Sequence, residues 1–303
     1  MPDSKLVTMP EAISRFVQNG SAVALGTAQE TLIPFAAGHE LIRQRKRNLT
    51  LIGTISDILF DQVIGGGCVR KVLAAWVGNV ITGSSYNFRR AIESGNTEIE
   101  DHSNLTMSMS LRAAAMGVPF MPARTALGSD LFKSNAGLKT ITCPFTGDTL
   151  TAVAAIQPDV TIVHTQRADE HGNAHMWGNM GITREACLAS DGVIITAEEI
   201  VPTETIRSDP NRVVIPGFLV RAVVHAPWGG HPSPVPGCYN RDHQSFLDYR
   251  TASRTPESFA DWKAFWIDNV KNSADYLIRV GKNRMDRLKV KHHLRSAPAD
   301  FGY

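Results

Sequence analysis

The chain has 303 residues, of which 43% are hydrophobic and 20% are charged, and its net charge is +2. A chain of this length buries roughly three-quarters of its unfolded surface, so it needs neither disulfides nor a metal to fold. The weak positive charge gives no argument for a nucleic-acid-binding or membrane-surface protein, which needs a concentrated basic patch. No apolar run approaches the 18 residues that indicate a membrane-spanning helix.

The four cysteines, at positions 68, 143, 187 and 238, are far apart and form no CxxC pair. This spacing argues against a disulfide framework and against a zinc ribbon. The N-terminal stretch MPDSKLVTMPEA has no apolar segment of the kind found in a signal peptide. We therefore expect a cytoplasmic protein with reduced thiols and no metal site.

The first elements alternate between helix and strand. Thr8 and Glu11 have the spacing of a capping box, which predicts a helix that begins here and ends before Gly20. A buried strand over 21–25 follows, and the next helix ends in the cations of 43–47. We interpret these cations as solvated charges at a helix C-terminus and not as a nucleic-acid site.

The alternation of strand and helix continues along most of the chain. Strands are predicted at 49–52, 69–76, 159–164 and 192–196, and helices at 57–64, 88–94, 103–116 and 183–189. Continuous apolar strands separated by helices are typical of a parallel sheet covered on both faces. We predict a doubly wound α/β domain that binds its ligand at the carboxyl ends of the strands. Those ends are the loops 26–33, 53–57, 77–86 and 197–204.

The last part of the chain has a different pattern. The segment 229–237 contains three prolines and is predicted to be irregular. Thr255 then begins an amphipathic helix with four aromatic residues on one side, namely Phe259, Trp262, Phe265 and Trp266. This aromatic face can belong to the core, or it can pack on a second protein chain. We predict a main domain over 1–234 and an extension over 235–303 that packs on that domain or on a partner.

The stretch TQRADEHGNAHMWG, residues 165–178, contains two histidines four positions apart. A zinc protease requires HExxH on a helix, whereas here a glycine and an asparagine lie between His171 and His175. Strand-like patterns flank the segment on both sides. We therefore predict a turn over 169–173 in which the glycine and the asparagine adopt positive φ, and no metal site.

Three further catalytic motifs are not matched. Gly65-Gly66-Gly67 lacks the spacing and the Lys-Ser/Thr of a phosphate-binding loop, so we interpret it as a helix stop. Gly83-Ser84-Ser85 is not the nucleophile motif of a serine hydrolase. Gly26 stands alone after the first strand, which excludes a dinucleotide fingerprint. Spacing rules thus indicate a fold and a site location but no reaction.

Short motifs along the chain resemble the A (alpha) subunits of the family I coenzyme A transferases, especially those of the glutaconate and 3-oxoadipate CoA-transferases. The resemblance extends from residue 8 to about 275 and implies the CoA-transferase fold, which NagB- and RpiA-like proteins share. It is carried by eleven stretches in the family's order: AVALG (22–26), HELIR (39–43), IGGGCVRK (64–71), GVPF (117–120), LGSDL (127–131), CPFTG (143–147), QPDV (157–160), ADEHGN (168–173), WG (177–178), EEIV (198–201) and GHPS (230–233).

The resemblance implies a ping-pong reaction that moves CoA from one carboxylate to another. In this family a glutamate attacks the acyl-CoA thioester to form a mixed anhydride, and the CoA thiolate then returns to form a glutamyl-CoA thioester. CoA passes from there to a second acid, while backbone N–H groups hold the developing oxyanion. The CoA thioester is a substrate, and no permanently bound cofactor is expected.

In the family the nucleophilic glutamate belongs to the β subunit, where it follows a strand directly. The equivalent place in this chain is Leu51-Ile52-Gly53-Thr54-Ile55, which contains no carboxylate. The resemblance therefore implies that this chain is the non-catalytic partner in an α2β2 or α4β4 hetero-oligomer. It would be active only together with a CoA-transferase β subunit, and it would bind neither nucleic acid nor membrane.

The resemblance also implies that the strand-end loops form one wall of the acyl pocket. The substrate-binding candidates are Gly26, Thr27, Gln29, Glu30, Asn79, Val80 and Ser84. The first loop is one residue longer than in the 3-oxoadipate enzymes, and Val80 replaces a serine of the glutaconate enzymes. Both departures favour an acyl group less polar than glutaconate. Gln29 and Glu30 can alternatively form an exposed loop tip.

A related branch of the family hydrolyses a carbon–carbon bond in a ring-bearing acyl-CoA during steroid degradation. An acid near the segment 98–104 is implicated there, so Glu100, together with Glu30, is a candidate catalytic acid within this chain. The alternative is a strand end followed by a helix cap at Asp101 or Ser103. Bacterial sugar-phosphate sensors share the fold, but they need a DNA-binding motif before the first strand.

Overall fold

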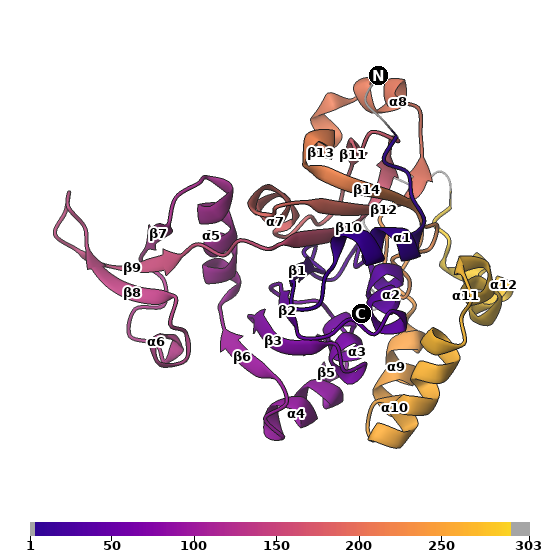
Figure 1. Cartoon of the computed structure of the whole chain (residues 1–303), viewed down its shortest axis with the longest axis horizontal. Helices are drawn as coiled ribbons and strands as arrows, with labels where there is room; N and C mark the ends of the chain where they lie inside the picture. The colour runs from indigo at the N-terminus through magenta and orange to yellow at the C-terminus, as the bar shows by residue number, and fades with distance from the viewer. Residues whose placement is uncertain (1–3, 292–303) are drawn as a thin grey trace.

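A computed structural model describes residues 4–291 and centres on a nine-stranded sheet within those residues (Figure 1). Seven strands are parallel and follow the order β14-β12-β10-β1-β2-β3-β6. Their bounds are Val220–His225, Val193–Ile200, Val160–Ala168, Ala22–Leu25, Leu49–Ile52, Val69–Ala74 and Glu98–Asp101, in that order. The predicted doubly wound α/β fold is confirmed.

The direction of winding reverses between β1 and β10. From β1 the chain moves outward to β2, β3 and β6, and from β10 it moves the other way to β12 and β14. Ligands of such sheets bind beyond the carboxyl ends of the strands at this reversal. Two short antiparallel strands, β11 (Ala174–His175) and β13 (Val213–Ile215), continue the sheet beside the far end of β10.

Helices cover the two faces of the sheet, and alternate strand residues contact each layer. Val23 and Leu25 belong to the largest buried cluster, which contains side chains of three helices, α1 (Met9–Phe16), α2 (Phe35–Arg43) and α3 (Leu59–Gly65). Ala24 packs on the opposite face with Ala22 at its margin, against α5 (Asn104–Ala115) and α7 (Thr183–Ala189). This alternation is the period of two that a strand imposes. The parallel strands are therefore buried on both faces.

Several predicted element boundaries can be compared with the structure. The strand at 49–52 and the helix at 183–189 have the predicted bounds. Thr8 caps α1, since its hydroxyl accepts from the Glu11 N–H at 3.4 Å, but the helix ends at Phe16 and not at residue 19. The helix predicted to begin at Asp57 begins at Leu59, because Asp57 has a φ of 52° and cannot be helical.

The stretch with two histidines forms the predicted turn. Asp169 Oδ1 accepts from the backbone N–H groups of His171 and Asn173, at 3.0 and 2.8 Å, and Gly172 has a φ of 91°. The prediction of positive φ for Asn173 is wrong. Its side chain instead closes the turn by donating to Asp169 Oδ2 and accepting from the Gly217 N–H.

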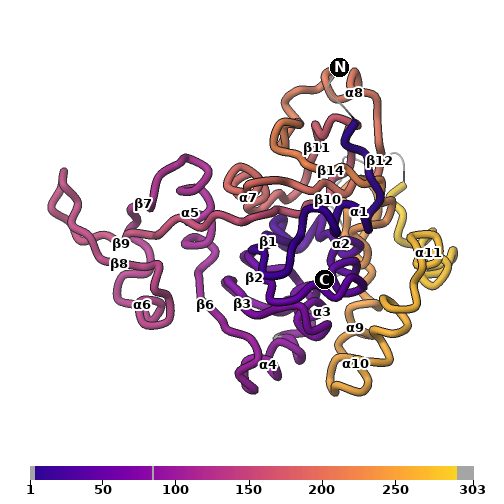
Figure 2. The backbone as a smooth tube through the Cα atoms, in the orientation of Figure 1, coloured from indigo at the N-terminus to yellow at the C-terminus, as the bar shows by residue number. Residues whose placement is uncertain are grey.

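An insertion between α5 and β10 projects from the body of the molecule (Figure 2). It contains α6 (Leu131–Ser134) and a three-stranded antiparallel sheet in the order β7-β9-β8. The strands have the bounds Phe120–Ala123, Thr149–Ala154 and Leu138–Thr142. The sequence patterns above contain no prediction for this sheet.

The C-terminal part of the described chain forms a series of helical segments, and the first three of them contribute side chains to the buried cluster of α1 to α3. They are α9 (His243–Ala252), α10 (Pro256–Lys263), a π-helical turn (Ala264–Asp268), α11 (Ser273–Val280) and α12 (Lys282–Leu288), and the short α8 (Thr203–Arg207) precedes them. Phe259 is buried in the main cluster, with Trp262 and Trp266 packed on it, whereas Phe265 is 51% exposed. The aromatic face is thus core for three of its four residues, and a domain boundary after residue 234 remains a prediction. No helix in residues 4–291 is long and apolar enough to cross a membrane.

Candidate functional site

Three loops follow the carboxyl ends of β1, β2 and β3 beside the reversal point. Two of them touch through Gly26 and Ser56, since a Cβ on Gly26 would lie 2.3 Å from the Ser56 hydroxyl. Gly26 also has a φ of 66°, so a side chain here would be strained as well as obstructed. Ser56 Oγ donates to the Leu25 carbonyl at 2.7 Å and fixes this contact.

A buried polar cluster connects the three loops, and we name it the Arg241 cluster after its central residue. It consists of Glu30, Asp57, Asn79 and Arg241. The guanidinium Nη2 of Arg241 lies 3.2 Å from Glu30 Oε2 and 3.2 Å from Asp57 Oδ2. Asn79 Nδ2 donates to the other oxygen of Asp57 at 2.5 Å. The side chains of Arg241 and Asp57 are fully buried, whereas that of Glu30 is 17% exposed.

The electrostatics of this cluster are dominated by burial. Burial raises the pKa of the Asp57 carboxyl to about 7, although the Arg241 charge and the Asn79 amide oppose the rise. Glu30 adds to the rise because it is a second negative charge beside the same guanidinium. Near neutral pH, Asp57 is therefore poised between its protonated and ionised forms.

Asn79 also orders the hairpin formed by β4 (Gly78–Asn79) and β5 (Gly83–Ser84). Its Oδ1 accepts from the N–H groups of Ile81 and Thr82, at 2.9 and 3.1 Å. Val80 lies in the turn between these two strands and is 52% exposed. The structure describes the backbone of Ser84 in β5 but not its side chain.

The remaining candidates of the first loop are held against the start of α7 and the segment that precedes it. Thr27 is buried, and its hydroxyl lies 2.9 Å from the hydroxyl of Thr183. Gln29 has a φ of 66° and accepts from the Asn179 side chain at 3.4 Å. The alternative of an exposed loop tip is wrong, because Gln29 is partly buried and Glu30 turns inward to Arg241.

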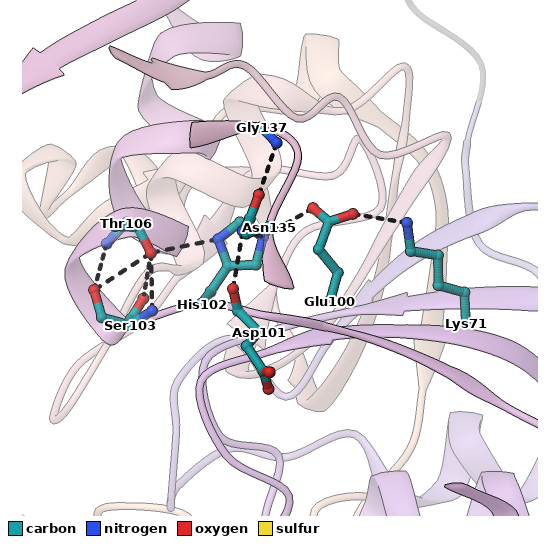
Figure 3. A network of polar contacts seen from close by, with 8 residues as sticks. All are labelled: Lys71, Glu100, Asp101, His102, Ser103, Thr106, Asn135 and Gly137. Atoms are coloured by element: carbon teal, nitrogen blue, oxygen red, sulfur yellow. Dashed lines mark hydrogen bonds and ion pairs between the residues drawn. The ribbon is translucent and has the colours of Figure 1, made fainter. Parts of the chain in front are cut away.

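A second carboxylate cluster lies at the end of β6 (Figure 3), and we name it the Glu100 cluster. Its members are Lys71, Glu100 and His102. Lys71 Nζ lies 2.7 Å from Glu100 Oε2, and His102 Nε2 lies 3.3 Å from Oε1. The hydrogen bond from His102 and the charge of Lys71 lower the pKa of Glu100 to about 2, although partial burial opposes them. The Glu100 side chain is 20% exposed, so this carboxylate is ionised and open to solvent.

The predicted helix cap beside Glu100 is partly confirmed. Ser103 caps α5 because its hydroxyl accepts from the Thr106 N–H at 3.0 Å, and the Thr106 hydroxyl accepts from the Ser103 N–H at 2.8 Å. Asp101 does not cap the helix. Its backbone carbonyl instead accepts from Asn135 Nδ2 at 2.9 Å, which connects β6 to the insertion. The candidate acid therefore lies beside a rigid helix terminus.

Sequence reasoning missed two members of the Arg241 cluster. Asp57 has the local signature of a helix start, and Arg241 follows a proline-rich segment without any motif. They lie 184 positions apart in the chain, so only the folded arrangement brings them together. The structure brings Glu30 and Asn79 into this cluster, whereas Glu100 lies in a separate one.

Comparisons with known proteins agree on one family. The coenzyme A transferase family model matches residues 6–226. The A subunit of 3-oxoadipate CoA-transferase of Pseudomonas knackmussii is 39% identical and covers 93% of this chain and 100% of the relative. The A subunit of glutaconate CoA-transferase of Acidaminococcus fermentans is 34% identical, with 95% of both chains covered. The crystal structure of that organism's glutaconate CoA-transferase superposes with a TM-score of 0.90 at 33% identity, covering 95% of this chain and 96% of the other.

A more distant relative carries a different name. The IpdA subunit of a cholesterol ring-cleaving hydrolase of Rhodococcus jostii is 26% identical and covers 92% of this chain and 96% of the relative.

Proposed function

Because this chain belongs to the coenzyme A transferase family and is a subunit of such an enzyme, we propose that it is the α subunit of a heteromeric CoA-transferase. The enzyme moves CoA between an acyl-CoA and a free 3-oxo or dicarboxylic acid. The names of two relatives support this substrate class, since 3-oxoadipate and glutaconate are both dicarboxylates. A β subunit completes the site in an α2β2 or α4β4 assembly.

The observation that carries this proposal is the ion pairing of the acids in the loops after β1, β2 and β3. These loops contain two acids, Glu30 and Asp57, and both are ion-paired with the buried Arg241. A nucleophilic carboxylate needs an oxygen that can reach the thioester carbonyl carbon. Within residues 4–291, the three loops offer no such free carboxylate. This pairing supports a nucleophilic glutamate that is supplied by the β subunit.

The partner's glutamate attacks the carbonyl carbon of the acyl-CoA, the carbon–sulfur bond breaks, and CoA leaves as a thiolate. The thiolate then attacks the glutamyl carbonyl of the mixed anhydride and releases the first acid as a carboxylate. The second acid reverses these two steps and leaves as a new acyl-CoA. In this scheme the loop of Gly26 and the hairpin of Val80 form one wall around the acyl group, and they exclude the water that would hydrolyse the anhydride.

The test is covalent trapping on the complex purified with its native β subunit. The complex is incubated with succinyl-CoA or acetyl-CoA, reduced with borohydride, and the modified peptide is identified by mass spectrometry. We expect one modified glutamate, and we expect it on the β subunit. Modification of a residue on this chain would contradict the division of roles. Full transfer activity of this chain alone would contradict the need for a partner.

A second function is favoured by one observation, the partly exposed and ionised Glu100 beside Lys71 and His102. A relative named as a ring-cleaving hydrolase makes a ring-cleaving hydrolase that acts on a CoA thioester the alternative. The variant Glu100→Gln separates the two functions because it keeps the size of the side chain and removes its charge. We expect the complex to retain transferase activity within about threefold, since the ion pairs of Glu100 are with Lys71 and His102, which lie outside the three loops. A loss of roughly a thousandfold or more, the scale of a missing catalytic acid or base, would favour the hydrolase.

A further inference from the structure

We propose that Arg241 is a positioning residue that holds the loops of the acyl pocket in one arrangement, so that the C-terminal extension sets the shape of the pocket. The inference rests on the proposed function, because it concerns the same pocket wall. It adds a residue from outside the strand-end loops, together with a role for the extension in substrate selection.

The contacts of Arg241 reach all three loops. Its Nη2 bridges the carboxylates of Glu30 and Asp57, one in each of the first two loops. Asp57 also accepts a hydrogen bond from Asn79 Nδ2, and Asn79 Oδ1 accepts from two backbone N–H groups of the hairpin turn. A continuous set of hydrogen bonds therefore connects residue 241 with the turn that contains Val80.

The Arg241 side chain and the residue that follows it are held in place by their neighbours. Its guanidinium lies over the ring of Phe246, with Cζ 4.8 Å from the ring centroid. The next residue, Asp242, accepts from Ser245 at the start of α9 and lies 2.8 Å from His231 Nε2 and 2.6 Å from Arg284 Nε. Arg241 is therefore attached to the core and to two C-terminal helices, and it can transmit their position to the loops.

The loops need such a restraint for a conformational reason. Gln29 and Asp57 both have positive φ, at 66° and 52°, which side-chain-bearing residues rarely adopt. Such conformations persist only when the surroundings determine them. Without Arg241, Glu30 and Asp57 would also repel each other, and both loops would relax to other conformations. The acyl pocket would lose its shape, although the Arg241 side chain is itself fully buried.

Guanidinium chemistry is required at this position. Arg241 contacts both carboxylates through Nη2 while its Cζ lies over the Phe246 ring. A lysine ammonium is a compact and strongly hydrated point charge, so it does not combine these contacts in the same way as a planar guanidinium. The variant Arg241→Lys keeps the charge and much of the length, so it is the mildest test of positioning. Arg287, an exposed arginine in α12, provides the matched control Arg287→Gln.

The experiment measures steady-state kinetics and hydrogen–deuterium exchange on the complex with the β subunit. We expect Arg241→Lys to raise the KM for the acid and to lower kcat/KM for the acid by about tenfold to a hundredfold, the scale of a misplaced wall. The KM for the acyl-CoA donor should change less than about twofold, because CoA contacts extend beyond the acyl wall. Amide exchange in 26–34, 53–58 and 78–84 should rise about tenfold, while Arg287→Gln leaves both readouts unchanged.

Two results would overturn the proposal. One is an unchanged KM for the acid with a lower kcat in proportion to the loss of folded complex, which is the signature of a purely structural role. The other is unchanged exchange in the three loops. If the wild-type complex fails to transfer CoA, the proposed function fails, but the exchange measurement still decides the role of Arg241.

Discussion

The Arg241 cluster and the Glu100 cluster lie at the loops and strand ends of one parallel sheet, and their acids have opposite properties. In the Arg241 cluster, Asp57 is fully buried and its pKa is raised to about 7. In the Glu100 cluster, the carboxylate is partly exposed and its pKa is lowered to about 2. Asp57 has Arg241 at 3.2 Å as its basic partner, whereas Glu100 has Lys71 at 2.7 Å and His102 at 3.3 Å, so the two acids differ both in burial and in their partners.

The contrast shows that the solvent around an acid matters as much as its nearest cation. Desolvation destabilises the charged form of Asp57 by more than the Arg241 cation stabilises it. Glu100 keeps part of its hydration, and its hydrogen bond from His102 and ion pair with Lys71 therefore favour ionisation. The first cluster is suited to holding loops, and the second is suited to presenting a charge to a ligand.

The largest expected effect is on stability when the cation of the buried cluster is removed. The variant Arg241→Met leaves Asp57 buried without a countercharge, and we expect a loss of about 3 to 5 kcal/mol in the free energy of unfolding at pH 8. At lower pH the loss should shrink, because Asp57 can take up a proton. Urea unfolding of single and double variants checks this. Adding Asp57→Asn to Arg241→Met should recover more than half of the loss, and a cost below about 1 kcal/mol for the single variant would contradict it.

The pH dependence of stability should differ in sign between the clusters. Because the folded pKa of Asp57 is raised from 3.8 to about 7, its contribution is fully present below about pH 4 and is lost as the pH rises through 7. Because the folded pKa of Glu100 is lowered from 4.5 to about 2, its contribution is present above pH 4.5 and is lost as the pH falls toward 2. Unfolding free energies of wild type, Asp57→Asn and Glu100→Gln across this range check both signs. Parallel curves for all three proteins would refute the contrast.

These clusters also mark the limit of what the sequence could predict. The strand at 49–52 and the helix at 183–189 were predictable because their apolar pattern and stop signals are local. The antiparallel insertion was not, since β7 contains a proline, β8 has no continuous apolar run, and both strands are mostly exposed or half-buried. Among the site residues, family resemblance led to Glu30, Asn79 and Glu100. Asp57 and Arg241 were missed, because their pairing depends on a tertiary contact and not on spacing.

A smaller effect is expected on stability when Glu100 loses its charge. The ion pair with Lys71 is partly solvated, with side chains 28% and 20% exposed, so Glu100→Gln should cost about 1 kcal/mol or less at pH 7. High salt should reduce this cost further. Thermal or urea unfolding at low and high ionic strength measures it. A cost as large as that of Arg241→Met would mean that Glu100 is a structural residue and not a presented charge.

The smallest expected change in stability is at the hairpin, where the effect is on specificity. Val80 is 52% exposed, so Val80→Ser should change the free energy of unfolding by no more than about 0.5 kcal/mol. If Val80 contributes to the acyl wall, a hydroxyl there should favour the more polar acid. We expect the ratio of kcat/KM for glutaconate over kcat/KM for 2-pentenoate, its monocarboxylic counterpart, to rise by about tenfold. Val118→Ser, on the insertion, is the matched control, since Val118 is also exposed but lies outside the three loops. An unchanged ratio in Val80→Ser would remove Val80 from the pocket and leave the arrangement of the Arg241 cluster as the main determinant of the acyl wall.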